Sequence, residues 1–136
     1  MKVVIKATEQ EKALIKVCGI PVVRRLLHTL RAADLRDVIA VTGPDGRAVK
    51  EALGDGTDLG MRLTYVENEE AFPTQRLKAM LDGPFLLIEG NCVLDERILG
   101  RLAEEEGMAI AYDSRVKEGL QVPASLPSPC CRKRWP

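Results

Sequence analysis

Few side chains in this sequence stand in a pattern that predicts a familiar kind of catalysis. His28, the single histidine, falls on the polar side of an apolar stripe at helical spacing, which favours a solvated surface residue over a catalytic base. No serine lies in a GxSxG nucleophile elbow. The turn at 43–46 lacks the lysine of a Walker loop, and no GxGxxG motif follows the first apolar run. The sequence therefore does not indicate serine hydrolase, Walker-type or dinucleotide-binding chemistry.

The four cysteines do not form a zinc-binding pattern. Cys18, Cys92, Cys130 and Cys131 include no CxxC pair, whereas a structural zinc site needs four clustered Cys or His ligands. Cys18 and Cys92 lie in or beside apolar segments, which predicts buried, reduced thiols. Because reduced thiols are typical of the cytosol, we expect a cytoplasmic location.

Apolar runs alternate with amphipathic helical patterns along most of the chain. Strands are predicted at Lys2–Lys6, Asp37–Thr42, Met61–Val66, Phe85–Ile88 and Met108–Tyr112. Helices are predicted from Pro21 through Leu30 and at Arg47–Leu53, Pro73–Leu81 and Asp95–Glu106. Strands that are almost wholly Val, Ile and Leu, separated by helices, are typical of sheets covered on both faces. The pattern predicts an α/β fold with a doubly wound, mostly parallel sheet in three layers.

Ligands of such sheets bind outside the carboxyl ends of the strands. The segments that follow the predicted strands are 7–12, 43–46, 67–74 and 89–93. We expect residues 1–113 to form the α/β domain and residues 114–136 to form a Pro-rich, flexible tail with a basic, cysteine-containing end. The candidate site thus lies among the loops of the first domain.

Composition excludes several classes of partner. The chain has 136 residues, and its 20 Lys and Arg balance 20 Asp and Glu, so no basic surface for nucleic acid is indicated. Aromatic residues make up 4% of the chain, too few for a base-stacking platform. No apolar run approaches the roughly 20 residues of a membrane span. We expect neither a nucleic-acid nor a membrane partner.

Four segments, in this order, resemble one family of enzymes. They are 12–23 (KALIKVCGIPVV), 35–43 (LRDVIAVTG), 63–68 (LTYVEN) and 81–91 (LDGPFLLIEGN). Together they resemble the nucleotidyltransferases that join a nucleoside triphosphate to a phosphorylated small molecule. The family includes sugar-phosphate nucleotidyltransferases and molybdenum-cofactor guanylyltransferases, and the closest likeness is to the cytidylyltransferases for inositol phosphate and phosphocholine. The resemblance covers residues 1–112.

The resemblance implies roles for four residues. Lys12 matches the lysine that contacts the phosphates, so it is the candidate catalytic residue. Thr74 and Gln75 fall where the family reads the base, and Asn91 falls where the family has an aspartate that binds Mg²⁺. The implied cofactor is Mg²⁺, and the implied substrates are a nucleoside triphosphate, with CTP favoured, and a phosphorylated alcohol or sugar.

The sequence departs from the family at the same positions. The Gly-rich phosphate loop is missing between Ala7 and Lys12, and the neutral Asn91 replaces the charged metal ligand. The family's second metal aspartate and its acceptor-binding half have no counterpart in these 136 residues. Local structural roles are the alternatives: a solvated Lys12, a helix start at Thr74 and a turn at Asn91. Asp45 and Asp95 are likewise interpreted as a turn residue and a helix start.

Three functions agree with this pattern. The first is a nucleotidyltransferase-like domain with impaired catalysis that acts as a binding or assembly module, in a homodimer or with another protein. The second is an active enzyme that releases pyrophosphate. The third is a truncated product of a longer nucleotidyltransferase. A fourth interpretation, an unrelated doubly wound protein, shares the fold alone.

Overall fold

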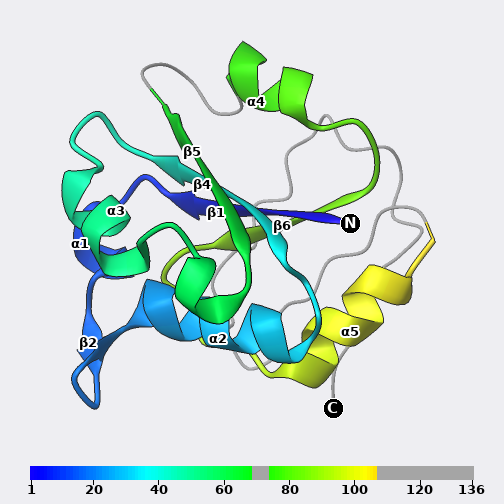
Figure 1. The fold of residues 1–136 in the computed structure, drawn as a ribbon, viewed down its shortest axis with the longest axis horizontal. Coiled ribbons are helices and arrows are strands. Elements are labelled where there is room, and N and C mark those ends of the chain that lie inside the picture. Colours follow the sequence, from blue (N-terminus) through cyan, green and yellow to red (C-terminus); the bar gives the residue numbers. More distant parts are fainter. Residues whose placement is uncertain (69–73, 107–136) are drawn as a thin grey trace, which may run out of the picture.

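The computed structural model describes residues 1–68 and 74–106, which form a parallel sheet between two layers of helices (Figure 1). The strands of this sheet are β1 (Lys2–Ala7), β4 (Asp37–Thr42), β5 (Arg62–Glu67) and β6 (Phe85–Glu89). The helices are α1 (Gln10–Ala13), α2 (Val22–Ala32), α3 (Arg47–Leu53), α4 (Gln75–Met80) and α5 (Glu96–Glu104). A small hairpin, β2 (Lys16–Val17) and β3 (Ile20–Pro21), and the 3₁₀ turn η1 (Thr57–Leu59) complete the elements.

The strand order β5-β4-β1-β6 confirms the doubly wound α/β fold. All three strand pairings within this four-stranded sheet are parallel, and the order reverses direction beside β1. The predicted strand at 37–42 and helix at 47–53 have the expected bounds, and the others differ by one or two residues at their ends. The strand predicted at 108–112, the boundary at 113 and the tail lie outside the described residues.

Each face of the sheet has its own apolar core. Val3 and Ile5 of β1 point to the face covered by α2, α3 and α5, whereas Val4 points to the face covered by Leu77 of α4. Alternation along β1 sends successive side chains to opposite faces, which explains the run of buried residues. Figure 1 shows α2 and α5 on one side of the sheet and α4 on the other. Within the described residues, no helix is long and apolar enough to cross a bilayer.

Two helices begin at the residues that the sequence indicated. The Thr74 hydroxyl accepts a hydrogen bond from the Leu77 amide at 3.2 Å, so Thr74 is the N-cap of α4. The Asp95 carboxylate accepts one from the Arg97 amide at 2.8 Å and caps α5. Hydrogen bonds from the Arg97 side chain and amide lower the pKa of Asp95 to about 2. Both helix starts predicted from the sequence are therefore confirmed.

The prediction that Cys18 is buried was wrong. Cys18 is exposed at the tip of the β2–β3 hairpin, which the sequence analysis did not predict. Cys18 and Gly19 form the two-residue turn, and their φ angles are 51° and 76°. Two positive φ angles are typical of the type I′ turn, which matches the twist of the paired strands. The apolar run around Cys18 thus forms a projecting hairpin and not a buried segment; Cys92, by contrast, is half-buried.

Replacing Cys18 by Asn is expected to stabilise the protein by about 0.5–1 kcal/mol. Asn tolerates the left-handed conformation and is preferred before Gly in this turn, whereas Cys is not. Cys18→Val is the matched control, because a β-branched side chain at positive φ is strongly disfavoured. Urea denaturation of both variants checks this, and equal stability of the two variants would contradict the turn assignment.

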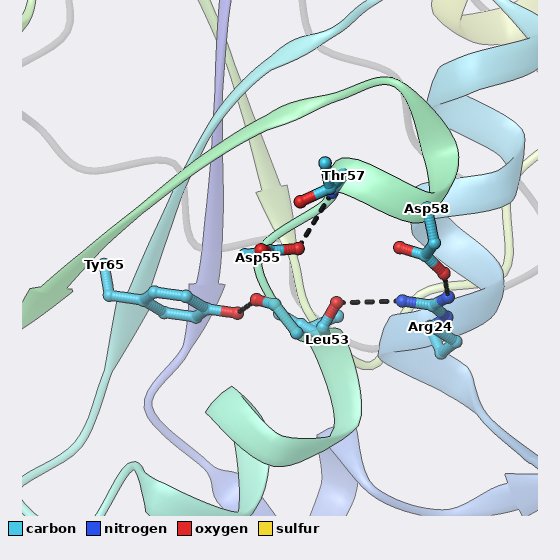
Figure 2. A network of polar contacts seen from close by, with 7 residues as sticks. Arg24, Leu53, Asp55, Thr57, Asp58 and Tyr65 are labelled. Atoms are coloured by element: carbon cyan, nitrogen blue, oxygen red, sulfur yellow. Dashed lines mark hydrogen bonds and ion pairs between the residues drawn. The ribbon is translucent and has the colours of Figure 1, made fainter.

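A polar network ties α2 to the loop between α3 and β5 (Figure 2). The guanidinium of Arg24 donates a hydrogen bond to the Leu53 carbonyl at 2.8 Å and forms an ion pair with Asp58. The Tyr65 hydroxyl donates to the Gly54 carbonyl, and burial raises the pKa of Tyr65. These bonds satisfy carbonyls at the end of α3, so Arg24 has a structural role that its place on the polar side of α2 did not predict.

Candidate functional site

A cleft lies at the carboxyl ends of β1 and β4, where the fold class predicts a ligand site. It is open to solvent and has a volume of about 490 Å³. Its lining residues come from the segments after the two strands: Thr8, Glu9, Gln10, Glu11, Lys12, Gly43, Pro44 and Asp45. Of the four residues with roles implied by the resemblance, the cleft contains Lys12.

The backbones of the two loops of the cleft lie close together. A Cβ atom at Gly43 would lie 3.1 Å from the Thr8 carbonyl oxygen, so the loops approach as nearly as glycine allows. Gly46 packs in the same way on the side chain of Thr42, which is fully buried. A side chain at either glycine would therefore press against a neighbouring residue at this end of the sheet.

Two buried polar atoms at this end of the described structure lack a hydrogen-bond partner. They are the side-chain Oε1 of Gln10, which lines the cleft, and the hydroxyl oxygen of Thr42 at the end of β4. Buried polar groups in native proteins are nearly always hydrogen-bonded, and the exceptions call for a functional or structural reason. Their position beside the cleft favours this end of the sheet as the functional end.

Lys12 does not present a free charge to the cleft. Its ammonium group lies 2.6 Å from a carboxylate oxygen of Glu9, and both side chains are exposed. The hydrogen bond and the charge of Lys12 lower the pKa of Glu9, and the same pair raises the pKa of Lys12. Thr8 and Glu9 are the only residues between β1 and α1, so the loop before Lys12 is short.

The cleft is acidic. Three carboxylates line it (Glu9, Glu11 and Asp45) against one ammonium group (Lys12), which gives a net charge of −2 when all are ionised. Asp45 lies in a turn, as the sequence indicated, and the acidic character of the cleft was not foreseen. The segment after the first strand could have predicted the pairing of Glu9 with Lys12, because Glu9 precedes Lys12 by one helical turn.

Asn91 lies outside this cleft, in an exposed turn after β6. Before it, the Gly90 amide donates to the Lys6 carbonyl at 2.9 Å, and a Cβ at Gly90 would lie 3.1 Å from that oxygen. The neighbouring Glu89 carboxylate is 3.4 Å from the Lys6 ammonium group. In residues 1–68 and 74–106, no three acidic, His or Cys side chains are grouped to hold a metal ion. The metal role of Asn91 stays a prediction.

Thr74 and Gln75 are also absent from the lining of the cleft. Thr74 uses its hydroxyl to cap α4, and Gln75 is exposed at the start of the same helix. The structure therefore does not bring Lys12, Thr74 and Asn91 into one cavity. The role of Thr74 and Gln75 in reading a base stays a prediction.

Two known proteins with similar sequences are glucose-1-phosphate thymidylyltransferases. Residues of this chain are 33% identical over 84 positions to a glucose-1-phosphate thymidylyltransferase of Neisseria gonorrhoeae, covering 61% of this chain and 28% of the relative. A glucose-1-phosphate thymidylyltransferase of Mycolicibacterium smegmatis is 40% identical over 60 positions, which are 43% of this chain and 21% of the relative. The chain thus spans less than a third of the length of these relatives. No family model matches it.

Two solved structures have folds similar to that of this chain. A nucleotidyl transferase from Methanothermobacter thermautotroptrophicus superposes with a TM-score of 0.60 at 21% identity, over 79% of this chain and 59% of that one. The chain has a nucleotidyltransferase fold. Rv0371C of Mycobacterium tuberculosis, solved as a manganese complex, gives a TM-score of 0.58 at 20% identity, over 76% of this chain and 57% of that one. The resemblance of the four segments is confirmed for the fold, and the likeness to cytidylyltransferases is not shown.

Proposed function

We propose that this chain is a nucleotidyltransferase-like domain with impaired binding of triphosphates, which acts as a binding or assembly module. The observation that carries the proposal is the ion pair of Lys12 with Glu9 inside an acidic cleft. A triphosphate is a polyanion, and its binding needs converging positive charges or backbone amides. This cleft offers one ammonium group, and a carboxylate already neutralises it.

The shortness of the loop after β1 supports the same proposal. Each charge-assisted phosphate contact contributes on the order of 1.5–3 kcal/mol, and a phosphate loop supplies several. Two residues between β1 and α1 leave room for few such donors. We expect the chain to bind nucleotides weakly and to act through a protein partner, in a homodimer or a mixed complex.

An active nucleotidyltransferase is the second candidate, and the sequence relatives favour it. In this candidate Lys12 contacts phosphate, Thr74 and Gln75 contact the base, and Asn91 helps to hold Mg²⁺. The names of the relatives suggest dTTP and a sugar phosphate as substrates, whereas the resemblance of the segments favours CTP. The partial coverage of the relatives also fits a truncated product of a longer enzyme.

A thermal-shift titration with dTTP, CTP, UTP, GTP and ATP, each with and without Mg²⁺, tests the proposal. A ligand at 100 times its Kd stabilises a protein by about 2.7 kcal/mol, which would raise the Tm by roughly 8 °C for a domain of this size. We expect no shift near this size for the unmodified chain. A shift for one nucleotide that grows with Mg²⁺ would overturn the proposal in favour of the active enzyme.

Glu9→Gln is expected to strengthen triphosphate binding on the order of tenfold. The substitution releases the Lys12 ammonium group and removes one of three carboxylates from the cleft, so repulsion of the polyanion falls. Glu51→Gln is the control, since Glu51 pairs with Arg47 at 3.2 Å on α3 and does not line the cleft. Calorimetric titration with each triphosphate measures the effect. Equal affinities of both variants would mean that the Glu9 carboxylate does not weaken triphosphate binding.

A further inference from the structure

Three aspartates in this sequence precede a glycine, and such a pair can rearrange covalently without a co-reactant. The pairs are Asp45–Gly46, Asp55–Gly56 and Asp82–Gly83. The glycine amide nitrogen attacks the side-chain carboxyl carbon of the aspartate, and the amide proton and a hydroxyl group leave as water. Glycine favours this attack because it has no side chain and few conformational restrictions. Water then opens the succinimide ring, and opening at the main-chain carbonyl gives isoaspartate.

Packing holds two of the three pairs in place. A Cβ at Gly46 would lie 2.3 Å from the hydroxyl oxygen of the fully buried Thr42. A Cβ at Gly56 would lie 2.8 Å from its nearest neighbours. The Asp55 carboxylate also accepts a hydrogen bond from the Thr57 amide at 2.9 Å (Figure 2). Ring closure rotates the peptide between the two residues, so a closely packed glycine must first be released by local opening.

Asp82–Gly83 lies instead in an open connection between α4 and β6. Both residues are exposed, and a Cβ at Gly83 would meet no atom within 4 Å. The restraint on this pair in the described structure is an ion pair, in which the Lys2 ammonium group lies 2.9 Å from the Asp82 carboxylate. Its hydrogen bond lowers the pKa of Asp82. Because hydroxide leaves a carboxylate less readily than water leaves a neutral carboxyl group, Lys2 slows ring closure.

We propose that Asp82–Gly83 is the site at which this chain forms isoaspartate, and that the ion pair with Lys2 controls the rate. The rearrangement leaves the carboxylate on the α-carbon and lengthens the backbone by one atom, which disrupts the contact with Lys2. Lys2 also donates a hydrogen bond to the Met80 carbonyl at 2.6 Å, so it ties the start of β1 to the end of α4. The modification would weaken that tie. The product is the chemical group that protein-isoaspartate methyltransferases methylate.

Incubation of the full chain at about 37 °C and pH 6, followed by digestion and mass spectrometry with electron-transfer fragmentation, measures isoaspartate at each pair. We expect it to form at Asp82 at least about tenfold faster than at Asp45 or Asp55, because those two sites require local opening. In guanidinium chloride the fold is lost, and the three pairs should react at rates within about threefold of one another. Methyl transfer from S-adenosylmethionine by a protein-isoaspartate methyltransferase measures the product independently.

Lys2→Met is expected to speed the reaction at Asp82 by about two- to fivefold, the fold-change that corresponds to the strength of an exposed ion pair. Lys78→Met is the matched control, since it removes an exposed ammonium group from α4 and leaves the ion pair in place. Slow reaction at Asp45 and Asp55 in Lys2→Met would show that this variant is folded. Asp82→Glu should abolish the product at this position, because closure to a six-membered ring is slower.

Isoaspartate that forms at Asp45 or Asp55 as fast as at Asp82 in the folded chain would overturn the proposal. An unreacted Asp82 in the folded chain, at a time when all three pairs have reacted in guanidinium chloride, would overturn it too. Equal rates at Asp82 in Lys2→Met and in the unmodified chain would reject the control by the ion pair.

Discussion

Gly46→Ala is expected to lower the free energy of unfolding by about 3 kcal/mol. A Cβ at this position would overlap the hydroxyl and the Cβ of Thr42, whose side chain is fully buried. Forcing a methyl group into a closed contact of this kind typically costs 1–3 kcal/mol, and backbone movement adds to it. Because Gly46 precedes α3 and follows the cleft turn, the change would also widen the cleft.

Gly100→Ala is the matched control for this prediction. Gly100 lies inside α5, and a Cβ there would meet no atom within 4 Å. Alanine stabilises a helix interior by about 0.5–1 kcal/mol relative to glycine, so this variant should gain stability. Calorimetry should show the Tm falling by roughly 10 °C in one variant and rising by a few degrees in the other. Equal changes would contradict the close contact at Thr42.

Leu99→Ala is expected to cost 2–5 kcal/mol, the usual range for a fully buried leucine. Leu99 is 0% exposed and is the buried side chain through which α5 contacts the core beneath the sheet. The loss includes the transfer of the missing atoms to water and the cavity that remains.

Val93→Ala serves as the control for Leu99→Ala, since Val93 is 73% exposed. Surface substitutions of this type usually change stability by less than about 0.5 kcal/mol. Urea denaturation of the two variants measures the difference directly. A cost below about 1 kcal/mol for Leu99→Ala would mean that α5 does not pack as the structure shows.

The chemistry of the cleft depends on one short-range pair, Glu9 and Lys12. Exposed ion pairs are weak, and salt screens them, so a polyanion of sufficient charge would compete with Glu9 for Lys12. The acidic surroundings oppose that competition, because Glu11 and Asp45 remain after the exchange. The charge balance of the whole cleft, and not the identity of one lysine, therefore decides whether a nucleotide binds.

Much of the fold was predictable from local pattern. The bounds of β4 and α3 agreed with the spacing of their apolar residues, because a period of two or of 3.6 residues directly sets which side chains face a core. Thr74 and Asp95 cap helices through bonds to residues two or three positions away, so a short stretch of sequence contains both partners. The position of the cleft followed from the parallel order of the strands.

Tertiary structure decided the rest. The exposure of Cys18 depends on two positive φ angles that reverse the chain, which no apolar periodicity encodes. The close approach of Gly43 to Thr8 arises where segments distant in sequence meet. The sequence by itself determined the elements and their order, because those depend on neighbours along the chain. Only the folded chain determined the charge of the cleft, because that charge depends on which loops lie side by side.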